Sequence, residues 1–325
     1  MKAILFEQYG PPEKVLSLRE VEKPSPKHNE VLIKIKATAV NDYDWSLVRG
    51  QPYLYRLMFG FLKPKHPISG MELSGIVAEI GADVHNHKVG EAVFGDISEY
   101  GFGTFAEYIC INKNAVIKQP ETISFEEAAA LPHASTLALQ ALRDIGKIEQ
   151  GQKVLINGGG GGVGTIGLQL AKLYHCHVTG VDAQEKIEMM KSIGFDTTID
   201  YKQINFTKAG EKYDLILDCK TNKSAFSYLS ALKVNGRYVT IGGKVGSLIK
   251  VLLWSKLINL FSTKKLQVLS LKPNKDLDYI CELFREGKIK CEIDGPYALA
   301  ETPGLIQYFG EGKHKGKVVI KTDSP

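Results

Sequence analysis

The chain of 325 residues has few cysteines, and they lie far from one another along the sequence. No Cys-x-x-Cys pair occurs, which argues against a disulfide framework and against a four-cysteine zinc module. A sparse, odd set of cysteines is typical of free thiols in a reducing compartment, so we predict a cytoplasmic protein. The five are Cys110, Cys176, Cys219, Cys281 and Cys291.

The chain also lacks a strong charge of either sign and a long hydrophobic run. Its 41 Lys and Arg against 36 Asp and Glu give a formal net charge of +5. Apart from a basic cluster at 312–321 this charge is dispersed, whereas nucleic-acid binding requires a concentrated basic face. No apolar segment reaches the roughly 20 residues of a membrane span, and the start MKAILFEQYG turns polar too early for a signal peptide. We therefore expect neither a nucleic-acid partner nor a spanning helix.

The order of apolar patterns indicates two domains, one inserted into the other. Short alternating runs bounded by Gly, Pro and Asn fill the first third, which predicts a β-rich domain. From Lys153 onward short apolar strands alternate with amphipathic helices, the pattern of a doubly wound parallel sheet in an α/β protein. We assign residues 1–122 and 274–325 to the β-rich domain and 123–273 to the parallel-sheet domain.

Residues 247–261, SLIKVLLWSKLINLF, do not fit this alternation. They are apolar with a few interspersed polar residues, and Lys264 and Lys265 follow. A basic amphipathic helix of this kind can lie in a membrane interface, cover a substrate pocket or form a dimer face. The sequence does not choose among these three roles.

Five consecutive glycines stand between the apolar run VLIN and a helical pattern that begins near Gly162. Glycine loses more conformational entropy on folding than other residues, so such a run implies a close approach of the backbone to a ligand. A strand, a Gly-x-Gly-x-x-Gly turn and a helix form a dinucleotide-binding motif, in which N–H groups at the helix N-terminus bind the pyrophosphate. Two registers fit, Gly159/Gly161/Gly164 and Gly158/Gly161/Gly164. The cofactor contacts predicted from this segment are Gly159, Gly161, Gly162, Val163 and Gly164.

The end of the next strand carries the residue that meets the adenosine ribose in such a fold. This residue is Asp182, whose carboxylate would accept bonds from a ribose diol and repel a 2′-phosphate, which favours NAD(H). Lys186 and Tyr201 favour NADP(H), because they could contact a 2′-phosphate. Asp182 could instead be a helix N-cap. The sequence leaves the preference between NADH and NADPH open.

Blocks of sequence along nearly the whole chain follow the order of a known family, the most specific being VLIKIKATAVNDYDWSLVRG, ISGMELSGIVAEIG, AAALPHASTLALQAL, GGVGTIGLQLAK, YDLILDC and GRYVTIGG. In these blocks the chain resembles the medium-chain dehydrogenase/reductase superfamily, in its zinc-free, quinone-oxidoreductase-like branch. The resemblance implies a GroES-like β-rich domain that holds the substrate and a Rossmann domain that holds the nicotinamide.

The catalytic-zinc positions of that superfamily hold other residues here. Asn41 stands where its alcohol dehydrogenases place the first Cys, Met71 where they place a His, and the third Cys position falls near Ala134. None of these is a good zinc ligand, so we expect no zinc. Hydride addition to a quinone or an α,β-unsaturated carbonyl needs no Lewis acid, because orientation and a proton suffice.

By resemblance, the catalytic candidates lie in the segment NDYDW. Asn41 would hydrogen-bond the substrate or the nicotinamide, Tyr43 would donate to the substrate oxygen, and Asp44 would orient a neighbour. The proton comes from Tyr43 or from solvent. The alternative is a polar loop in which Asn41 or Asp44 satisfies backbone donors. His133, near a helix start, is more typical of a structural residue than of an acid.

Further cofactor contacts are expected where the crevice of such a sheet opens, at the carboxyl ends of its strands. Thr136 is placed near the carboxamide by resemblance. The others follow the fourth and fifth strands and are Cys219, Thr221, Ile241, Gly242 and Gly243.

Together these patterns predict a zinc-independent reductase of quinones or α,β-unsaturated carbonyls (enones and enals) that uses NADPH or NADH. The aromatic-rich stretch 53–62 and the segment 247–261 could wall an apolar substrate pocket, or could pack as core. One alternative is a non-catalytic NAD(P)H-binding sensor or scaffold, and another is the same reductase bound to a membrane surface. By resemblance we expect a homodimer formed through an edge strand of the parallel sheet, with 266–271 as the candidate strand.

Overall fold

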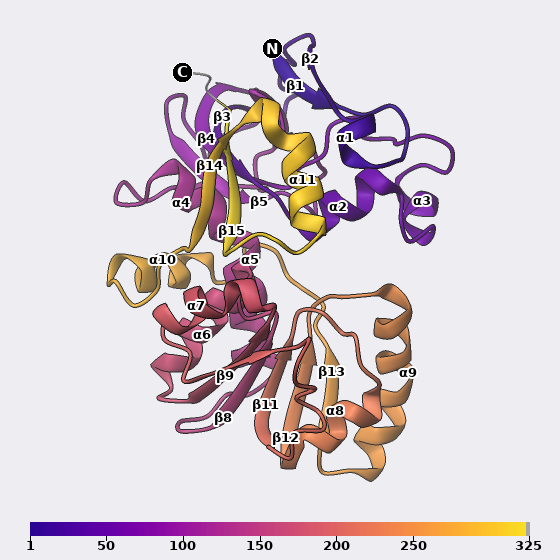
Figure 1. Cartoon of the computed structure of the whole chain (residues 1–325). Coiled ribbons are helices and arrows are strands. Elements are labelled where there is room, and N and C mark those ends of the chain that lie inside the picture. Colours follow the sequence, from indigo (N-terminus) through magenta and orange to yellow (C-terminus); the bar gives the residue numbers. More distant parts are fainter. Residues whose placement is uncertain (323–325) are drawn as a thin grey trace. The chain divides into compact units, whose positions relative to one another are not determined.

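The computed structural model describes residues 1–322, apart from the side chain of Met58. The chain forms two compact units, both drawn in Figure 1. The first unit comprises Met1–His133, Pro273–Leu277 and the described residues from Ile293 onward. The second comprises Ala134–Lys272 and Asp278–Glu292.

The first unit is built on a mixed seven-stranded sheet. Its order is β14-β15-β3-β4-β5-β7, with β6 also paired to β3, and a two-stranded sheet of β1 and β2 lies apart from it. Alternate residues of the long central strand β3 enter one apolar cluster with residues of β4, β5 and β6, as the period of two requires. The strands are β1 (Lys2–Leu5), β2 (Ser17–Glu20), β3 (Glu30–Ala39), β4 (Glu72–Ile80), β5 (Ala92–Asp96), β6 (Tyr108–Asn112), β7 (Ile117–Lys118), β14 (Ile293–Ala298) and β15 (Lys317–Lys321).

Short helices connect these strands. The helix that carries NDYDW begins directly after β3 and ends at Gly50, whose φ of +58° suits a residue without a side chain. The helices of this unit are α1 (Pro12–Val15), α2 (Asp42–Arg49), α3 (Leu54–Phe59), α4 (Phe125–Ala130), the 3₁₀ turn η2 (Leu299–Glu301) and α11 (Thr302–Gly310).

The second unit is a doubly wound sheet of six parallel strands in the order β10-β9-β8-β11-β12-β13. Its strands are β8 (Lys153–Asn157), β9 (His177–Asp182), β10 (Thr197–Asp200), β11 (Tyr213–Asp218), β12 (Leu232–Thr240) and β13 (Lys265–Val268). Its helices are α5 (Pro132–Leu139), the π-helical segment η1 (Gln140–Ile145), α6 (Gly162–Leu173), α7 (Gln184–Ser192), α8 (Ala225–Ala231), α9 (Val245–Phe261) and α10 (Leu277–Arg285). This architecture confirms the predicted fold class.

The two units differ from the predicted domain boundaries at two segments. Residues 123–133, which include α4, belong to the first unit, where the hydroxyl of Ser74 on β4 donates to the carbonyl oxygen of Phe125 over 2.5 Å. Residues 278–292, which include most of α10, belong to the second unit, where the side chain of Gln169 on α6 bonds both backbone groups of Lys290. Both contacts join residues far apart in sequence, so no local pattern records them.

Candidate functional site

The first candidate site lies at the carboxyl ends of β8 and β11, in the second unit. The strand order reverses between these neighbours, because β9 and β10 continue on one side and β12 and β13 on the other. Ligands of such sheets bind outside the carboxyl ends at this switch point. Asn157 and Asp218, the last residues of the two strands, are register partners, and Asn157 Nδ2 donates to Asp218 Oδ1 over 2.8 Å.

The glycine run forms the turn from β8 into α6. Gly158 has a φ of +95°, which only glycine adopts easily. A Cβ atom on Gly164 would lie 2.3 Å from the carbonyl oxygen of Gly158, so the helix packs directly on the turn. A tight turn and close packing are the roles of the first and third glycines of the dinucleotide motif. The structure therefore selects the register Gly158/Gly161/Gly164.

Gly159 has a different role from the other glycines of the run. A Cβ atom there would lie 2.8 Å from Cε of Met190 and 3.0 Å from Cζ of Phe195. This glycine therefore makes room for the packing of α7 and the following loop. Its contact with a cofactor stays a prediction, whereas Gly158 was missing from the predicted contacts.

The start of α6 suits a dinucleotide pyrophosphate chemically. The first N–H groups of any helix have no intrahelical acceptor, and the N-cap here is Gly161, which has no side chain to cap them. The positive end of the helix dipole adds to the attraction for a phosphate. Gly161, Gly162, Val163 and Gly164 form this start and would hold the pyrophosphate of a bound NAD(P)H.

Asp182, at the end of β9, is buried and already bonded within its unit. Its Oδ2 accepts the N–H of Gly160 and its Oδ1 accepts the N–H of Ala183, each over 2.9 Å. Nζ of the buried Lys186 lies 3.6 Å from Oδ1, and the N–H of Tyr201 donates to the Asp182 carbonyl oxygen. The structure thus brings Asp182, Lys186 and Tyr201 together at one strand end. The N-cap of α7 is Ala183, so Asp182 does not cap it.

The turns after β11 and β12 lie against each other. Thr221 is buried with a φ of +38°, and its hydroxyl donates to the carbonyl oxygen of Gly242 over 2.5 Å. Gly243 has a φ of +123°, and a Cβ atom on it would lie 2.2 Å from the carbonyl oxygen of Lys220. The predicted residues Thr221, Gly242 and Gly243 are therefore neighbours, and a side chain at Gly243 would separate the turns.

Asp218 organises these turns. Its Oδ1 accepts the backbone N–H groups of Lys220 and Thr221 in addition to the amide of Asn157, and its Oδ2 accepts the hydroxyl of Tyr238 over 2.8 Å. The N–H of Ile241 donates to the Asp218 carbonyl oxygen. Asp218 is therefore a positioning residue for the predicted contacts Cys219, Thr221 and Ile241.

The predicted contact Cys219 carries a thiol, and Ser135, next to the predicted contact Thr136, carries a hydroxyl. Desolvation raises the pKa of Cys219 to about 12, so its thiol is protonated near neutral pH. Thr136, on α5, is buried beside Ser135, whose buried Oγ has no hydrogen-bond partner among residues 1–322. A ligand could supply the partner that Ser135 lacks.

The catalytic candidates all lie in the first unit, where Asn41 belongs to a buried polar network. Asn41 Nδ2 donates to Glu72 Oε2 over 2.7 Å, and Asn41 Oδ1 accepts from Lys317 Nζ over 2.5 Å. Lys317 also forms an ion pair with the same carboxylate oxygen of Glu72. Glu72 Oε1 accepts the N–H of His133 over 2.6 Å. The Asn41 amide is thus engaged within the unit, which gives this residue a positioning role.

Glu72 and Lys317 were missed at the level of sequence. They are separated by most of the chain and pair only when β4 and β15 enter one sheet. The one local signal was a glutamate at the start of a strand that is mostly apolar. A buried carboxylate requires a partner, so Glu72 alone could have prompted a search for a distant cation.

Asp44 joins the start of α2 to the loop before β4. Its Oδ2 accepts the N–H of Asn41 and its Oδ1 accepts the N–H of Gly70, each over 2.8 Å. Burial raises the pKa of Asp44 to about 7, although both bonds oppose this shift. Asp44 satisfies backbone donors, as the alternative interpretation of the sequence expected.

Tyr43 has its ring in an aromatic cluster and is 39% exposed. Its ring centroid lies 6.3 Å from that of Tyr55 and 6.4 Å from those of Phe102 and His133. Desolvation, and then the charges of Asp96 and Asp42, raise the pKa of Tyr43, so its hydroxyl is neutral and can donate. Of the three catalytic candidates, it is the exposed one.

His133 pairs with a buried carboxylate at the edge of this cluster. Its Nδ1 lies 2.7 Å from Oδ2 of Asp96. Desolvation acts to raise the pKa of Asp96, but His133 and the hydrogen bonds from Ser98 together lower it. Asp96 is therefore ionised near neutral pH and holds the His133 ring next to Tyr43.

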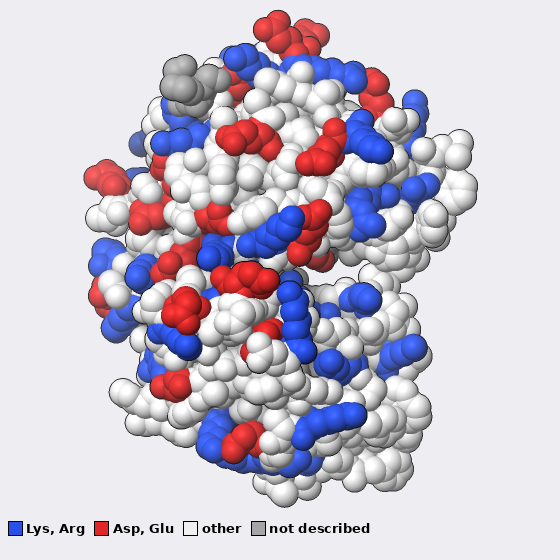
Figure 2. All heavy atoms as spheres, viewed as in Figure 1, with Lys and Arg blue, Asp and Glu red and all other residues white. Residues whose placement is uncertain are grey.

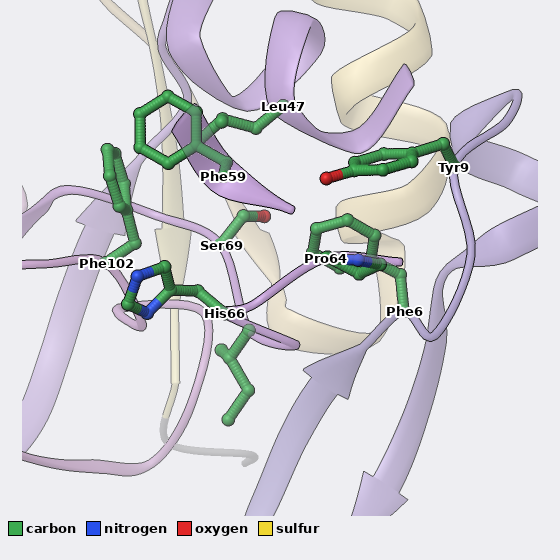
Figure 3. Close-up of a pocket in the computed structure, with 9 residues that line it drawn as sticks. Phe6, Tyr9, Leu47, Phe59, Pro64, His66, Ser69 and Phe102 are labelled. Atoms are coloured by element: carbon green, nitrogen blue, oxygen red, sulfur yellow. The ribbon is translucent and has the colours of Figure 1, made fainter. Parts of the chain in front are cut away.

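A small apolar pocket opens beside the same aromatic cluster (Figure 3). Phe102 of the aromatic cluster also lines the pocket. Phe59 lines it too, and its ring centroid lies 5.6 Å from that of Phe102. Ser69 contributes a buried hydroxyl that has no hydrogen-bond partner among the residues described. The pocket is lined by Phe6, Tyr9, Leu47, Phe59, Pro64, His66, Ile68, Ser69 and Phe102. From the aromatic-rich stretch 53–62, Phe59 reaches this pocket, whereas Tyr53, Leu57, Phe61 and Leu62 are exposed.

No three His, Cys, Asp or Glu side chains within residues 1–322 are arranged to hold a metal ion. Asn41, Met71 and Ala134, the three positions assigned by resemblance to zinc ligands, are all buried, and the amide of Asn41 bonds Glu72 and Lys317.

Comparison with known proteins gives two family matches and many full-length relatives. Residues 27–121 match the alcohol dehydrogenase GroES-like domain, and residues 193–320 match a family described as zinc-binding dehydrogenase. The chain is 31% identical to a chloroplast envelope quinone oxidoreductase homolog of Arabidopsis thaliana over 334 residues, covering 99% of this chain and 98% of that protein. It is 28% identical to the NADPH-dependent alkenal/one oxidoreductase of the same plant, covering 98% of this chain and 79% of that protein.

The solved structure of the quinone oxidoreductase from Coxiella burnetii is similar over the whole chain. Its TM-score is 0.87 at 30% sequence identity, and the match covers 99% of both chains. Full-length identity at this level shows common ancestry and not only a common fold. The chain therefore belongs to the medium-chain dehydrogenase/reductase superfamily, in its quinone-oxidoreductase-like branch.

Proposed function

We propose that the protein is an NAD(P)H-dependent oxidoreductase that reduces quinones or α,β-unsaturated carbonyls by hydride transfer, without a catalytic zinc. The observation that carries this proposal is the uncapped start of α6 packed on the Gly158/Gly161/Gly164 turn. A bound NAD(P)H supplies the hydride. The names of the two Arabidopsis relatives, a quinone oxidoreductase homolog and an alkenal/one oxidoreductase, support the substrate class.

The zinc-independent part of the proposal rests on how Glu72 is neutralised. The ammonium of Lys317 and the amide of Asn41 both bond this buried carboxylate. The network therefore needs no metal ion for its charge balance, and it offers neither thiolate nor imidazole for one.

The proposed proton donor is Tyr43. Negative charge develops on the substrate oxygen as the hydride arrives, and a neutral hydroxyl can donate a bond to it and then a proton. Tyr43 is the exposed residue among the three catalytic candidates, its phenol is neutral, and the neighbouring pocket is apolar. Asp44 and Asn41 would act through α2, by holding its start in position.

For the cofactor we propose use of both NADH and NADPH. Asp182 carries the charge that would repel a 2′-phosphate, but Lys186 lies beside it and compensates part of that charge. Contacts to the ribose or its phosphate are assigned to Asp182, Lys186 and Tyr201. Contacts to the rest of the cofactor are assigned to Thr136, Cys219, Thr221, Ile241, Gly242 and Gly243.

A homodimer and a cytoplasmic location complete the proposal. β13, which overlaps the candidate segment 266–271, is an edge strand of the parallel sheet, which supports pairing with a second copy. The five cysteines are free, as in a reducing compartment.

The test is the loss of nicotinamide absorbance, measured with NADPH and with NADH, in the presence of EDTA. The substrates are an ortho-quinone and a 2-alkenal. We expect turnover of at least one of them, and metal analysis of the same sample should find no stoichiometric zinc. Tyr43→Phe should lower kcat by about 100-fold, with KM much less affected, whereas Tyr55→Phe, which changes a neighbouring ring in the same way, should leave kcat near wild type.

Three results would count against the proposal. One zinc per chain would remove its zinc-independent part, and an unchanged kcat in Tyr43→Phe would move the proton source to solvent. If neither substrate turns over while NADPH binding is still detected by fluorescence, the non-catalytic sensor or scaffold becomes the better hypothesis.

A further inference from the structure

The long helix α9 exposes a largely apolar face, in which Lys250 and Lys256 are the charged residues, although its opposite face is buried. Val251, Ser255 and Ile258 form the buried face. A surface helix normally has polar residues on the side away from the core. Here the exposed side carries apolar residues at helical spacing, namely Ile249, Leu252, Leu253 (65% exposed), Leu257 (51%), Leu260 (73%) and Phe261 (79%).

Two aromatic rings extend this apolar face toward α8. Trp254 is 44% exposed and Phe226, on α8, is 54% exposed. Their ring centroids lie 5.0 Å apart with the planes at 63°. Tryptophan favours the boundary between apolar chains and water because its ring is large and apolar but carries a polar N–H group.

The charged residues in the segment of the chain that carries this face are all positive. From residue 219 to residue 275 the chain has eleven Lys and Arg and neither Asp nor Glu. Lys244, at the N-cap of α9, and Lys250 and Lys256, on the helix itself, are exposed. In Figure 2, viewed as in Figure 1, the surface around α9 is accordingly white and blue. A charge of one sign over so long a segment selects an anionic partner.

The occupant of this face must be apolar at its centre and negative around it. A second copy packed face to face on α9 would place two sets of the lysines Lys250 and Lys256 against each other, which is unfavourable. The proposed pairing of copies through β13 uses a different surface, the sheet edge, where Asn259 of α9 bonds both backbone groups of Leu266. None of the helices within residues 1–322 is long and apolar enough to cross a bilayer. An exposed helix side that combines apolar residues, a tryptophan and lysines is suited to the headgroup layer, where the apolar side chains reach the acyl chains and the charges stay at the lipid phosphates.

We propose that α9 is an interfacial helix by which this protein docks on anionic lipid bilayers. Leu253, Leu257, Leu260 and Phe261 enter the boundary between headgroups and acyl chains, and Trp254 lies at its level. Lys250 and Lys256 bond lipid phosphates. This inference concerns a surface of the second unit and is independent of the activity proposed above.

The experiment is co-sedimentation of the full chain with vesicles of phosphatidylcholine alone or with about one third phosphatidylglycerol. We expect binding to the anionic vesicles, weaker binding to the neutral ones, and a loss of binding as salt is raised. Leu253→Glu/Leu257→Glu should lower the partition coefficient by about tenfold or more, because it places two charges in the apolar face. Lys250→Gln/Lys256→Gln should weaken binding to anionic vesicles and reduce its salt dependence.

The matched control is Val89→Glu/Ile204→Glu. These two side chains are 61% and 48% exposed, lie in loops outside α9, and undergo the same change of charge and polarity. This variant should bind vesicles like wild type, apart from a small uniform loss due to net charge. NADPH fluorescence titration and circular dichroism of every variant check that the fold is intact.

Two outcomes would overturn the proposal. In one, wild type does not bind anionic vesicles, or Leu253→Glu/Leu257→Glu binds them as well as the control variant does. In the other, wild type does not bind vesicles, and Leu253→Glu/Leu257→Glu lowers the molecular mass measured by light scattering. The face would then join two copies of the chain.

Discussion

At the scale of single residues, Asp182 shows how a side chain can serve structure and selectivity together. Its carboxylate holds the turn at Gly160 and the backbone at Ala183, and Lys186 lies beside it. A 2′-phosphate would meet one negative and one positive side chain here. The balance between these two charges, and not the aspartate alone, should set the preference between NADH and NADPH.

Replacing Asp182 by Ser should shift this balance toward NADPH. The serine hydroxyl can still accept a backbone N–H, whereas the negative charge beside Lys186 is removed. We expect the ratio of kcat/KM for NADPH to that for NADH to rise about tenfold, which corresponds to roughly 1.4 kcal/mol. The control is Glu188→Ser, which removes a charge from the exposed side of α7, the helix that carries Lys186. It should leave the ratio of kcat/KM for the two cofactors unchanged. An unchanged ratio in Asp182→Ser would show that this residue does not face the ribose.

At the scale of elements, the glycine turn depends on how closely α6 approaches β8. Gly164 lies in the first turn of α6 and packs against Gly158 and Gly159, where a Cβ atom would come within 2.3 to 2.7 Å of their backbone atoms. Backbone atoms cannot rotate away as a side chain can. The turn can therefore have this shape only because residue 164 has no Cβ atom.

Gly164→Ala should push the turn away from the helix start. We expect NADPH affinity to fall about tenfold or more, and the free energy of unfolding to fall by about 1–3 kcal/mol through overpacking. Gly246→Ala is the matched control, because Gly246 also lies in the first turn of a helix but its Cβ would meet nothing within 4 Å. Fluorescence titration and thermal unfolding measure both effects. Wild-type affinity in Gly164→Ala would refute the assignment of this turn to the pyrophosphate.

At the scale of the whole molecule, the exposed edge of the second unit's sheet is the place for a second copy to pair. β13 pairs with β12 on one side, and on the other side Asn259 already occupies both backbone groups of Leu266. Leu269 donates its N–H toward β12, so the alternation of a strand turns Val268 outward. Pairing between copies can therefore use Val268 but not Leu266.

Light scattering should give twice the chain mass of 35.9 kDa for wild type. Val268→Pro should shift the equilibrium toward the monomer, because proline removes an outward N–H and is tolerated at a sheet edge. Val234→Pro places proline at another exposed position of the same sheet and serves as the control. A monomeric wild type at micromolar concentration would contradict the edge-strand dimer.

The sequence by itself determined the features that depend on neighbouring residues. Three features follow from the spacing of nearby residues, because helices and strands each have a fixed period. They are the glycine run after VLIN, the alternation of strands and helices from Lys153, and the apolar segment 247–261. Only the tertiary structure decided the register at Gly158, the internal engagement of Asn41, and the two segments that changed domain. The register depends on how closely α6 packs on the turn. The engagement of Asn41 depends on the pair of Glu72 and Lys317, and the two segments depend on contacts such as that of Ser74 with Phe125, all between residues far apart in the chain. The energy of such a buried pair exists only once both partners leave water together, so no local pattern records it.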